Sequence, residues 1–183
     1  MNNKVLGIVG MIAAPFLYID FEMHGDNRLT GLFEFIYMSG WMCSIVGLYR
    51  LEATGTRLRG KSLLLIQLFL LSMAQLYNLD LFIESGTGSM LQQYFDWFWP
   101  ISNAFMFFTG IATIAAGRLP GWKKFMPLFA GTWLPAILLI ITINGKISNH
   151  LAGSYSTLAW FLLAMVVYST PHSKQHRQIP AFQ

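Results

Sequence analysis

The stretch KSLLLIQLFLLSMAQLYNLDLFIE, residues 61–84, decides the fold, because it combines the length of a bilayer crossing with amide and carboxyl groups. About 20 largely apolar residues span a hydrocarbon core of about 30 Å. At about 100° per residue, Gln67, Gln75 and Asn78 fall within one arc of about 80° on such a helix. A spanning helix with one polar side must turn that side toward other helices or water. The rest of the chain is therefore expected to cover this helix.

The composition points to a membrane protein along the whole chain. Of its 183 residues, 55% are hydrophobic and only 11% are charged, whereas about a quarter are charged in soluble proteins. The net charge of +4 comes from basic residues in short connections between apolar runs, which argues against a nucleic-acid partner. The single cysteine, Cys43, lies inside an apolar run and allows no disulfide framework.

Six apolar runs predict an all-α, polytopic bundle of six transmembrane helices in one domain, residues 1–170. A polar cytoplasmic tail follows at residues 171–183. The expected spans are about 5–19, 32–49, 62–83, 95–116, 125–143 and 151–168.

Small residues and prolines predict how some of these spans pack and bend. Gly7, Gly10 and Ala14 lie near one another on the first span, a pattern that lets another helix approach closely. Pro15 is expected to kink the outer half of the same span. In the fifth span Pro135 follows Gly131 by four residues and cannot bond to its carbonyl, so a bend is expected there.

Charge predicts the orientation. If both termini are cytoplasmic, ten Lys and Arg residues lie inside and only Arg28 and Lys146 lie outside, a strong positive-inside signal. This orientation requires an even number of spans, as six provides. Seven of the eight acidic residues then fall on or near the outer side, and Glu52 is the exception. Acidic residues contribute little to insertion, so their asymmetry indicates function.

Polar residues on the three middle spans predict a pocket open to the outer side. Carboxyl and amide groups in a bundle must find each other or water. The predicted ligand-binding residues are Glu34, Tyr37, Trp41, Gln75, Asn78, Asp96 and Asn103. The alternative is that the amide and hydroxyl groups only join helices by hydrogen bonds.

A metal site is a weaker hypothesis. The candidate ligands at the outer edge are Asp20, Glu22, His24 and His150, without a recognised ligand spacing. His172 and His176 are four residues apart but follow Pro171 in the polar tail. The sequence leaves the cofactor unknown and does not strongly imply any particular one.

Three functions remain open at this stage. The favoured one is a carrier, channel subunit or receptor that binds a cation, a proton or a small polar solute, with Glu34 as the titrating group. The second is an intramembrane enzyme acting on a lipid or other apolar substrate, with Glu34 and Asp96 as acid and base and a metal held by His24 or His150. The third is a non-catalytic accessory subunit. We expect a non-enzymatic protein of the plasma (cell inner) membrane, surrounded by lipid, that pairs with itself or with a membrane partner subunit.

Overall fold

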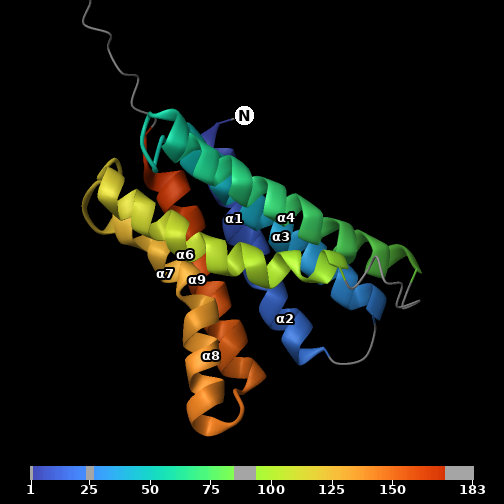
Figure 1. The fold of residues 1–183 in the computed structure, drawn as a ribbon. Coiled ribbons are helices and arrows are strands. Elements are labelled where there is room, and N and C mark those ends of the chain that lie inside the picture. Colours follow the sequence, from blue (N-terminus) through green and yellow to red (C-terminus); the bar gives the residue numbers. More distant parts are fainter. Residues whose placement is uncertain (1, 24–26, 85–93, 172–183) are drawn as a thin grey trace, which may run out of the picture.

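The computed structural model describes residues 2–23, 27–84 and 94–171, and every regular element in these ranges is a helix. The elements, in chain order, are α1 (Asn3–Ala13), α2 (Phe16–Glu22), α3 (Asn27–Arg50), α4 (Leu58–Glu84), α6 (Phe98–Ala116), the 3-10 helix η1 (Gly121–Phe125), α7 (Met126–Gly131), α8 (Trp133–Asn144) and α9 (Asn149–Ser169). Figure 1 shows α3 and α4 side by side, with α6 crossing them and α8 extending away with the first half of α9.

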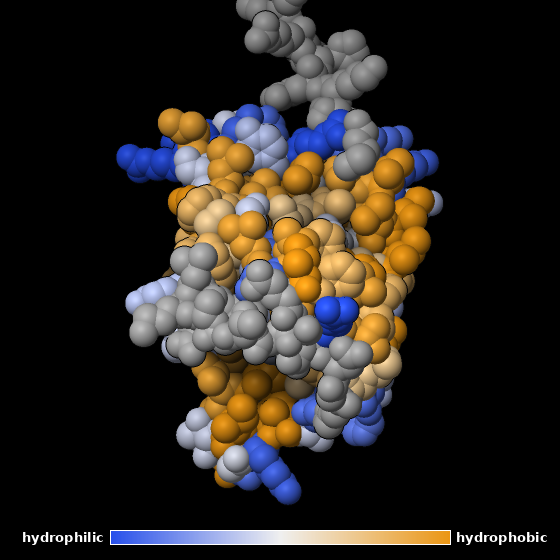
Figure 2. All heavy atoms as spheres, turned by 90° about the vertical axis from the view of Figure 1, so that its right-hand side faces the viewer, coloured by the Kyte–Doolittle hydropathy of each residue, from blue (hydrophilic) through white to orange (hydrophobic). Residues whose placement is uncertain are grey.

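The prediction of a helical membrane fold is confirmed at this level. Five helices of the described chain have the length and apolar composition to cross a membrane, and the number is six if the bent pair of helices at residues 121–144 forms one span. In the view of Figure 2 hydrophobic surface covers the middle of the molecule, and hydrophilic residues gather toward its upper and lower ends. The candidate spans, with the broken first and fifth spans each taken as a whole, begin and end within four residues of the expected bounds.

The two expected breaks are present. α1 ends at Ala13 and α2 begins at Phe16, on either side of Pro15. The fifth apolar run bends by 49° between α7 and α8, and the break itself lies at Thr132, between Gly131 and Pro135. Because Pro135 has no N–H, the Gly131 carbonyl lacks its usual helical partner and the helix axis can turn.

Side chains form hydrogen bonds at the break between α7 and α8. The hydroxyl groups of Thr132 and Tyr155 lie 2.7 Å apart. Both are within hydrogen-bonding distance of the Phe129 carbonyl, at 2.8 Å and 3.1 Å respectively. Tyr155 belongs to α9, so this contact also ties the broken helix to its neighbour.

Helix α1 is held between α3 and α9, as its small residues predict. A Cβ atom added at Gly7 would lie 2.6 Å from the Cβ of Tyr168 on α9. One added at Gly10 would lie 2.7 Å from Ser44 Oγ on α3. Any larger side chain at these two glycines would push the helices apart. The core beside α1 includes the rings of Trp41 and Trp160, whose centroids are 3.9 Å apart.

The connection between α3 and α4 is held by charges. Glu52 pairs with Lys61 and with Arg118, each at 3.2 Å. Arg118 follows the end of α6, so the carboxylate joins three helices at this end of the bundle. The hydrogen bond to Lys61 is the main reason why the pKa of Glu52 is lowered, and the hydrogen bond to Arg118 adds to it.

Candidate functional site

A cavity of about 170 Å³ lies where α2, α3, α4 and the start of the fourth span meet. We call it the acidic cavity. The oxygen-bearing side chains that line it are Thr30, Glu34, Tyr77, Asn78 and Asp96, and the remaining lining residues are Phe21, Met38, Ala74, Phe95 and Trp99. None of these described lining residues is a Lys, Arg or His.

Helical spacing brings the lining residues to one place. Thr30, Glu34 and Met38 follow one another at intervals of four on α3, so they share one face of that helix. Gly31 lets α4 come close beside them, since a Cβ atom there would lie 2.7 Å from the backbone nitrogen of Phe82. The close approach of these two helices places Glu34 and Asn78 around the same space.

The polar groups of the acidic cavity are mostly acceptors. Asp20 and Asp96 are both near enough to Glu34 for their charges to act on its carboxylate. Asn78 is 1% exposed. Its Nδ2 donates a long hydrogen bond, 3.4 Å, to Gln75 Oε1, and its Oδ1 has no hydrogen-bond partner. A buried acceptor without a partner is costly unless something donates to it or binds it. Carboxylate and carbonyl oxygens together suit a hard cation or a proton.

Three of the seven predicted ligand-binding residues line this cavity: Glu34, Asn78 and Asp96. The other four have neighbours elsewhere. Gln75 Nε2 donates to the Phe35 carbonyl and to Ser39 Oγ, both at 2.9 Å. Asn103 Nδ2 donates to the Trp99 carbonyl at 3.0 Å.

The two predicted aromatic residues, Tyr37 and Trp41, contact α9 instead of the cavity. The Tyr37 hydroxyl lies 3.2 Å from Ser156 Oγ, and Trp41 stacks on Trp160. These contacts hold α3 against α9. For both residues the structure therefore gives a packing role at this position.

Two of the proposed metal ligands, Glu22 and His150, contact each other. His150 Nδ1 lies 2.8 Å from Glu22 Oε1, and the Tyr18 hydroxyl lies 3.1 Å from the same nitrogen. Asp20, the remaining described candidate ligand, also interacts with another group of the protein. His24, His172 and His176 lie outside the described residues. Within the described ranges no three His, Cys, Asp or Glu side chains are grouped so that they could hold a metal ion.

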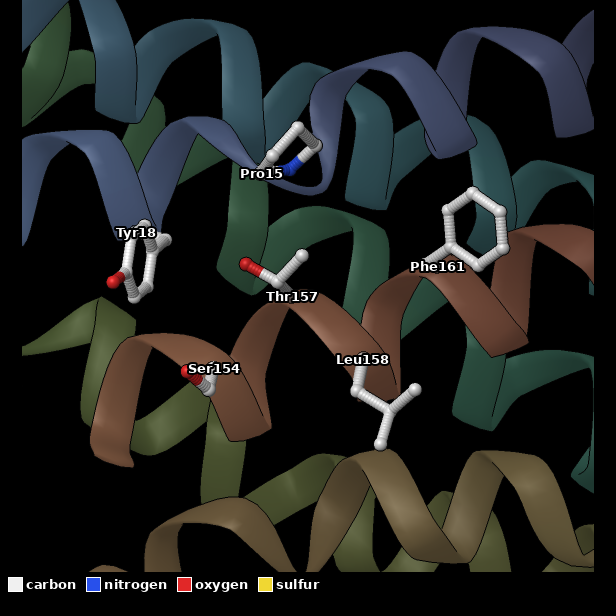
Figure 3. A pocket seen from close by; sticks show the side chains of 6 residues that line it. All are labelled: Pro15, Tyr18, Ser154, Thr157, Leu158 and Phe161. Carbon is white, nitrogen blue, oxygen red and sulfur yellow. The ribbon is translucent and has the colours of Figure 1, made fainter. Parts of the chain in front are cut away.

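A second, apolar hollow of about 380 Å³ lies beside the contact between Glu22 and His150. Tyr18 lines this hollow, and its hydroxyl is the one that lies near His150 Nδ1. Figure 3 shows its lining side chains, which come from the junction of α1 and α2 and from one face of α9. They are Pro15, Tyr18, Ser154, Thr157, Leu158 and Phe161. Neither Glu34 nor Asp96 lines it, so the hollow next to His150 and the acidic cavity are separate places.

The sequence analysis did not select Thr30, Tyr77 or Phe21 as site residues. The spacing of four between Thr30 and Glu34, and the position of Tyr77 next to Asn78, are signals that could have found the first two. Phe21 lies on α2, after the predicted break at Pro15, but no local pattern predicts that it lines the cavity. No protein-family model, curated protein or solved structure matches this chain, so the interpretation of the site comes from its own geometry.

Proposed function

We propose that the chain is a six-span protein of the plasma (cell inner) membrane, with both ends in the cytoplasm, that binds a small cation or a proton from the outer side in the acidic cavity. The excess of ten basic residues over two supports this orientation. Binding of this kind is the first step of a carrier, a channel subunit or a receptor.

One observation carries the proposal. Two carboxylates, Glu34 and Asp96, and the unpartnered oxygen of Asn78 surround one cavity whose described lining includes no basic side chain. Carboxylates inside a helical bundle are expensive, so they are placed where a charge partner or water can reach them. The described lining side chains include no cation, which supports a partner that comes from outside the chain.

The volume of the acidic cavity limits the size of the ligand that it can hold. A water molecule occupies about 30 Å³ of liquid volume, so 170 Å³ admits a cation with a few waters. Drug-sized and lipid-sized ligands usually occupy about 300 to 1,000 Å³. The volume of this cavity therefore favours a small cation over an apolar substrate as its ligand.

Binding to the purified full-length chain tests the proposal. The unfolding midpoint would be measured in detergent with added NaCl or CaCl₂ at constant ionic strength, and across a pH series for the proton. We expect one of these probes to stabilise the wild-type protein. Glu34→Gln and Asp96→Asn are each expected to weaken that response about tenfold or more, since each removes a charged ligand.

Asp80→Asn is the matched control. Asp80 is on α4, two residues from Asn78, and does not line the cavity. Its loss should leave the response unchanged. The proposal is overturned if wild type responds to none of the three probes, or if Asp80→Asn weakens the response as much as Glu34→Gln does.

A further inference from the structure

We propose a second ligand site, for a phosphate group, at the end of the bundle where α1 begins and α9 ends. A cavity of about 360 Å³ lies there, and we call it the terminal cavity. Its lining residues are Asn2, Asn3, Lys4, Tyr168, Ser169, Thr170 and Pro171. It shares no residue with the acidic cavity, so phosphate binding can be tested independently, while the choice of a lipid source rests on the proposed orientation with both ends in the cytoplasm.

The strongest sign of a ligand in the terminal cavity is Asn3. This side chain is 6% exposed, and neither its Nδ2 nor its Oδ1 has a hydrogen-bond partner. Asn3 is not needed to cap α1, because the Asn2 side chain already accepts the hydrogen bond from the Lys4 backbone nitrogen, at 3.3 Å. Burial of an amide without hydrogen-bond partners destabilises the folded protein. A ligand that accepts hydrogen bonds from Nδ2 would remove much of that cost.

The charges around the terminal cavity favour an anion. Lys4 is the charged residue in its lining, and the eleven-residue helix α1 begins here with the positive end of its dipole. The end of α9 would oppose an anion through its free carbonyl groups. Lys123 offsets this effect, because its Nζ donates to the Ser169 carbonyl at 2.9 Å and lies 3.3 Å from Thr170 Oγ1.

The one acidic side chain predicted for this end of the molecule is already neutralised. Glu52 is held by Lys61 and Arg118 at 3.2 Å each. No acidic residue lines the terminal cavity. The cavity thus offers an ammonium group, amide N–H groups and a helix N-terminus to whatever enters it.

These donors match a phosphate group, and the position suggests where it comes from. Basic pockets between helix ends on the cytoplasmic side bind phospholipid head groups, and anionic lipids enrich that leaflet. The terminal cavity lies between two helix ends, the start of α1 and the end of α9, both of which belong to candidate spans. A free phosphate from the cytoplasm offers the same chemistry, and the experiment separates the two sources.

The test uses the full-length chain with two probes. The first is inorganic phosphate added to protein purified in detergent and phosphate-free buffer. The second is a nanodisc of phosphatidylcholine with or without phosphatidylglycerol. The shift of the unfolding midpoint and the lipid retained in native mass spectrometry are the measurements. We expect at least one probe to bind, and Asn3→Leu and Lys4→Gln to weaken that binding about tenfold each, as loss of a charge-assisted hydrogen bond would.

Two controls make the result specific. Lys124→Gln removes a positive charge from the same end of the chain but outside the lining, and should bind as wild type does. Glu34→Gln should also bind phosphate normally, which keeps this result distinct from that of the acidic cavity. Binding of inorganic phosphate assigns a soluble ligand, and a response to phosphatidylglycerol alone assigns the lipid.

Asn3→Leu distinguishes a binding site from a merely unsatisfied amide. If Asn3 binds no ligand and its buried amide is only destabilising, Asn3→Leu will stabilise the protein equally in both nanodiscs. That result would overturn the proposal. It also falls if wild type binds neither probe or if Lys124→Gln loses as much binding as Lys4→Gln. Should Asn3→Leu fail to fold, the exposed Lys4 decides by itself, with the same outcomes.

Discussion

At the scale of single residues, Glu52 makes a prediction about pH. Its backbone has a φ of 52°, in the left-handed region that costs a residue with a Cβ about 1 kcal/mol, and its ion pairs with Lys61 and Arg118 help to hold it there. These pairs lower the pKa of Glu52, so their stabilisation is present above the unfolded-state pKa and is lost as the pH falls through the lower folded-state value.

We therefore expect Glu52→Gln to destabilise the protein at pH 7 by about 0.2 to 1 kcal/mol, the usual range for exposed pairs. The gap from wild type should close as the pH falls below the lowered folded-state pKa of Glu52, where both carry a neutral side chain. Unfolding in detergent across a pH series from 7 downward measures the gap. Arg57→Gln, in the same connection, is the control for general charge loss. A gap that does not change with pH would contradict the prediction.

The residues of the acidic cavity show how much of a site helical periodicity can predict from the sequence. Helical spacing correctly indicated that Glu34 and Asn78 lie on polar faces of neighbouring helices. It could not tell which neighbour each polar group would meet. Gln75 lies on the same arc as Asn78, yet it bonds to the Phe35 carbonyl on α3, because its longer side chain reaches that backbone. Tyr37 is one turn from Glu34 but is aimed at Ser156 of α9, a contact 119 residues away in sequence.

At the scale of elements, the break between α7 and α8 gives a prediction about Tyr155. Its hydroxyl lies 2.7 Å from Thr132 Oγ1 and 3.1 Å from the Phe129 carbonyl, at a point where the helix ladder is interrupted. Tyr155→Phe should lower the free energy of unfolding by about 0.6 to 2 kcal/mol, because backbone groups at the break lose a partner. Unfolding in detergent measures it. Tyr94→Phe, at a largely exposed tyrosine, should change little, and equal stability of the two variants would refute the role assigned to Tyr155.

The breaks also show what local sequence can predict about an element. Pro15 and Pro135 predict the two helix breaks, because the missing N–H of a proline removes a hydrogen bond within one helical turn. The angle of 49° and the location at Thr132 depend on the fit of α7 against α6. There a Cβ atom at Gly110 would lie 2.3 Å from the Cα of Leu128. The sequence of one segment alone does not predict how it packs against a distant segment. The presence of the bend could therefore be predicted, but its angle and exact position could not.

At the scale of the whole molecule, composition and charge predict a membrane bundle, while the number of crossings depends on one element. The segment from Gly121 to Asn144 either crosses as a bent span or enters and leaves on the same side. Its 24 residues would extend about 36 Å as a straight helix, enough for a core of about 30 Å even with a bend. The basic residues Lys123 and Lys124 before it, against Lys146 after it, favour a crossing with the start inside.

Labelling of single cysteines separates the two arrangements. Cys43→Ser removes the only native thiol, and Lys146→Cys or Lys124→Cys then adds one at either end of the bent segment. With six crossings and cytoplasmic termini, a membrane-impermeant maleimide should label position 146 in intact cells, and position 124 only after the membrane is permeabilised. A re-entrant segment would place both positions on the same side, so that they label together. That arrangement would put the two termini on opposite sides of the membrane, whereas residues from both ends of the described chain line the terminal cavity, so we expect the six-crossing labelling pattern.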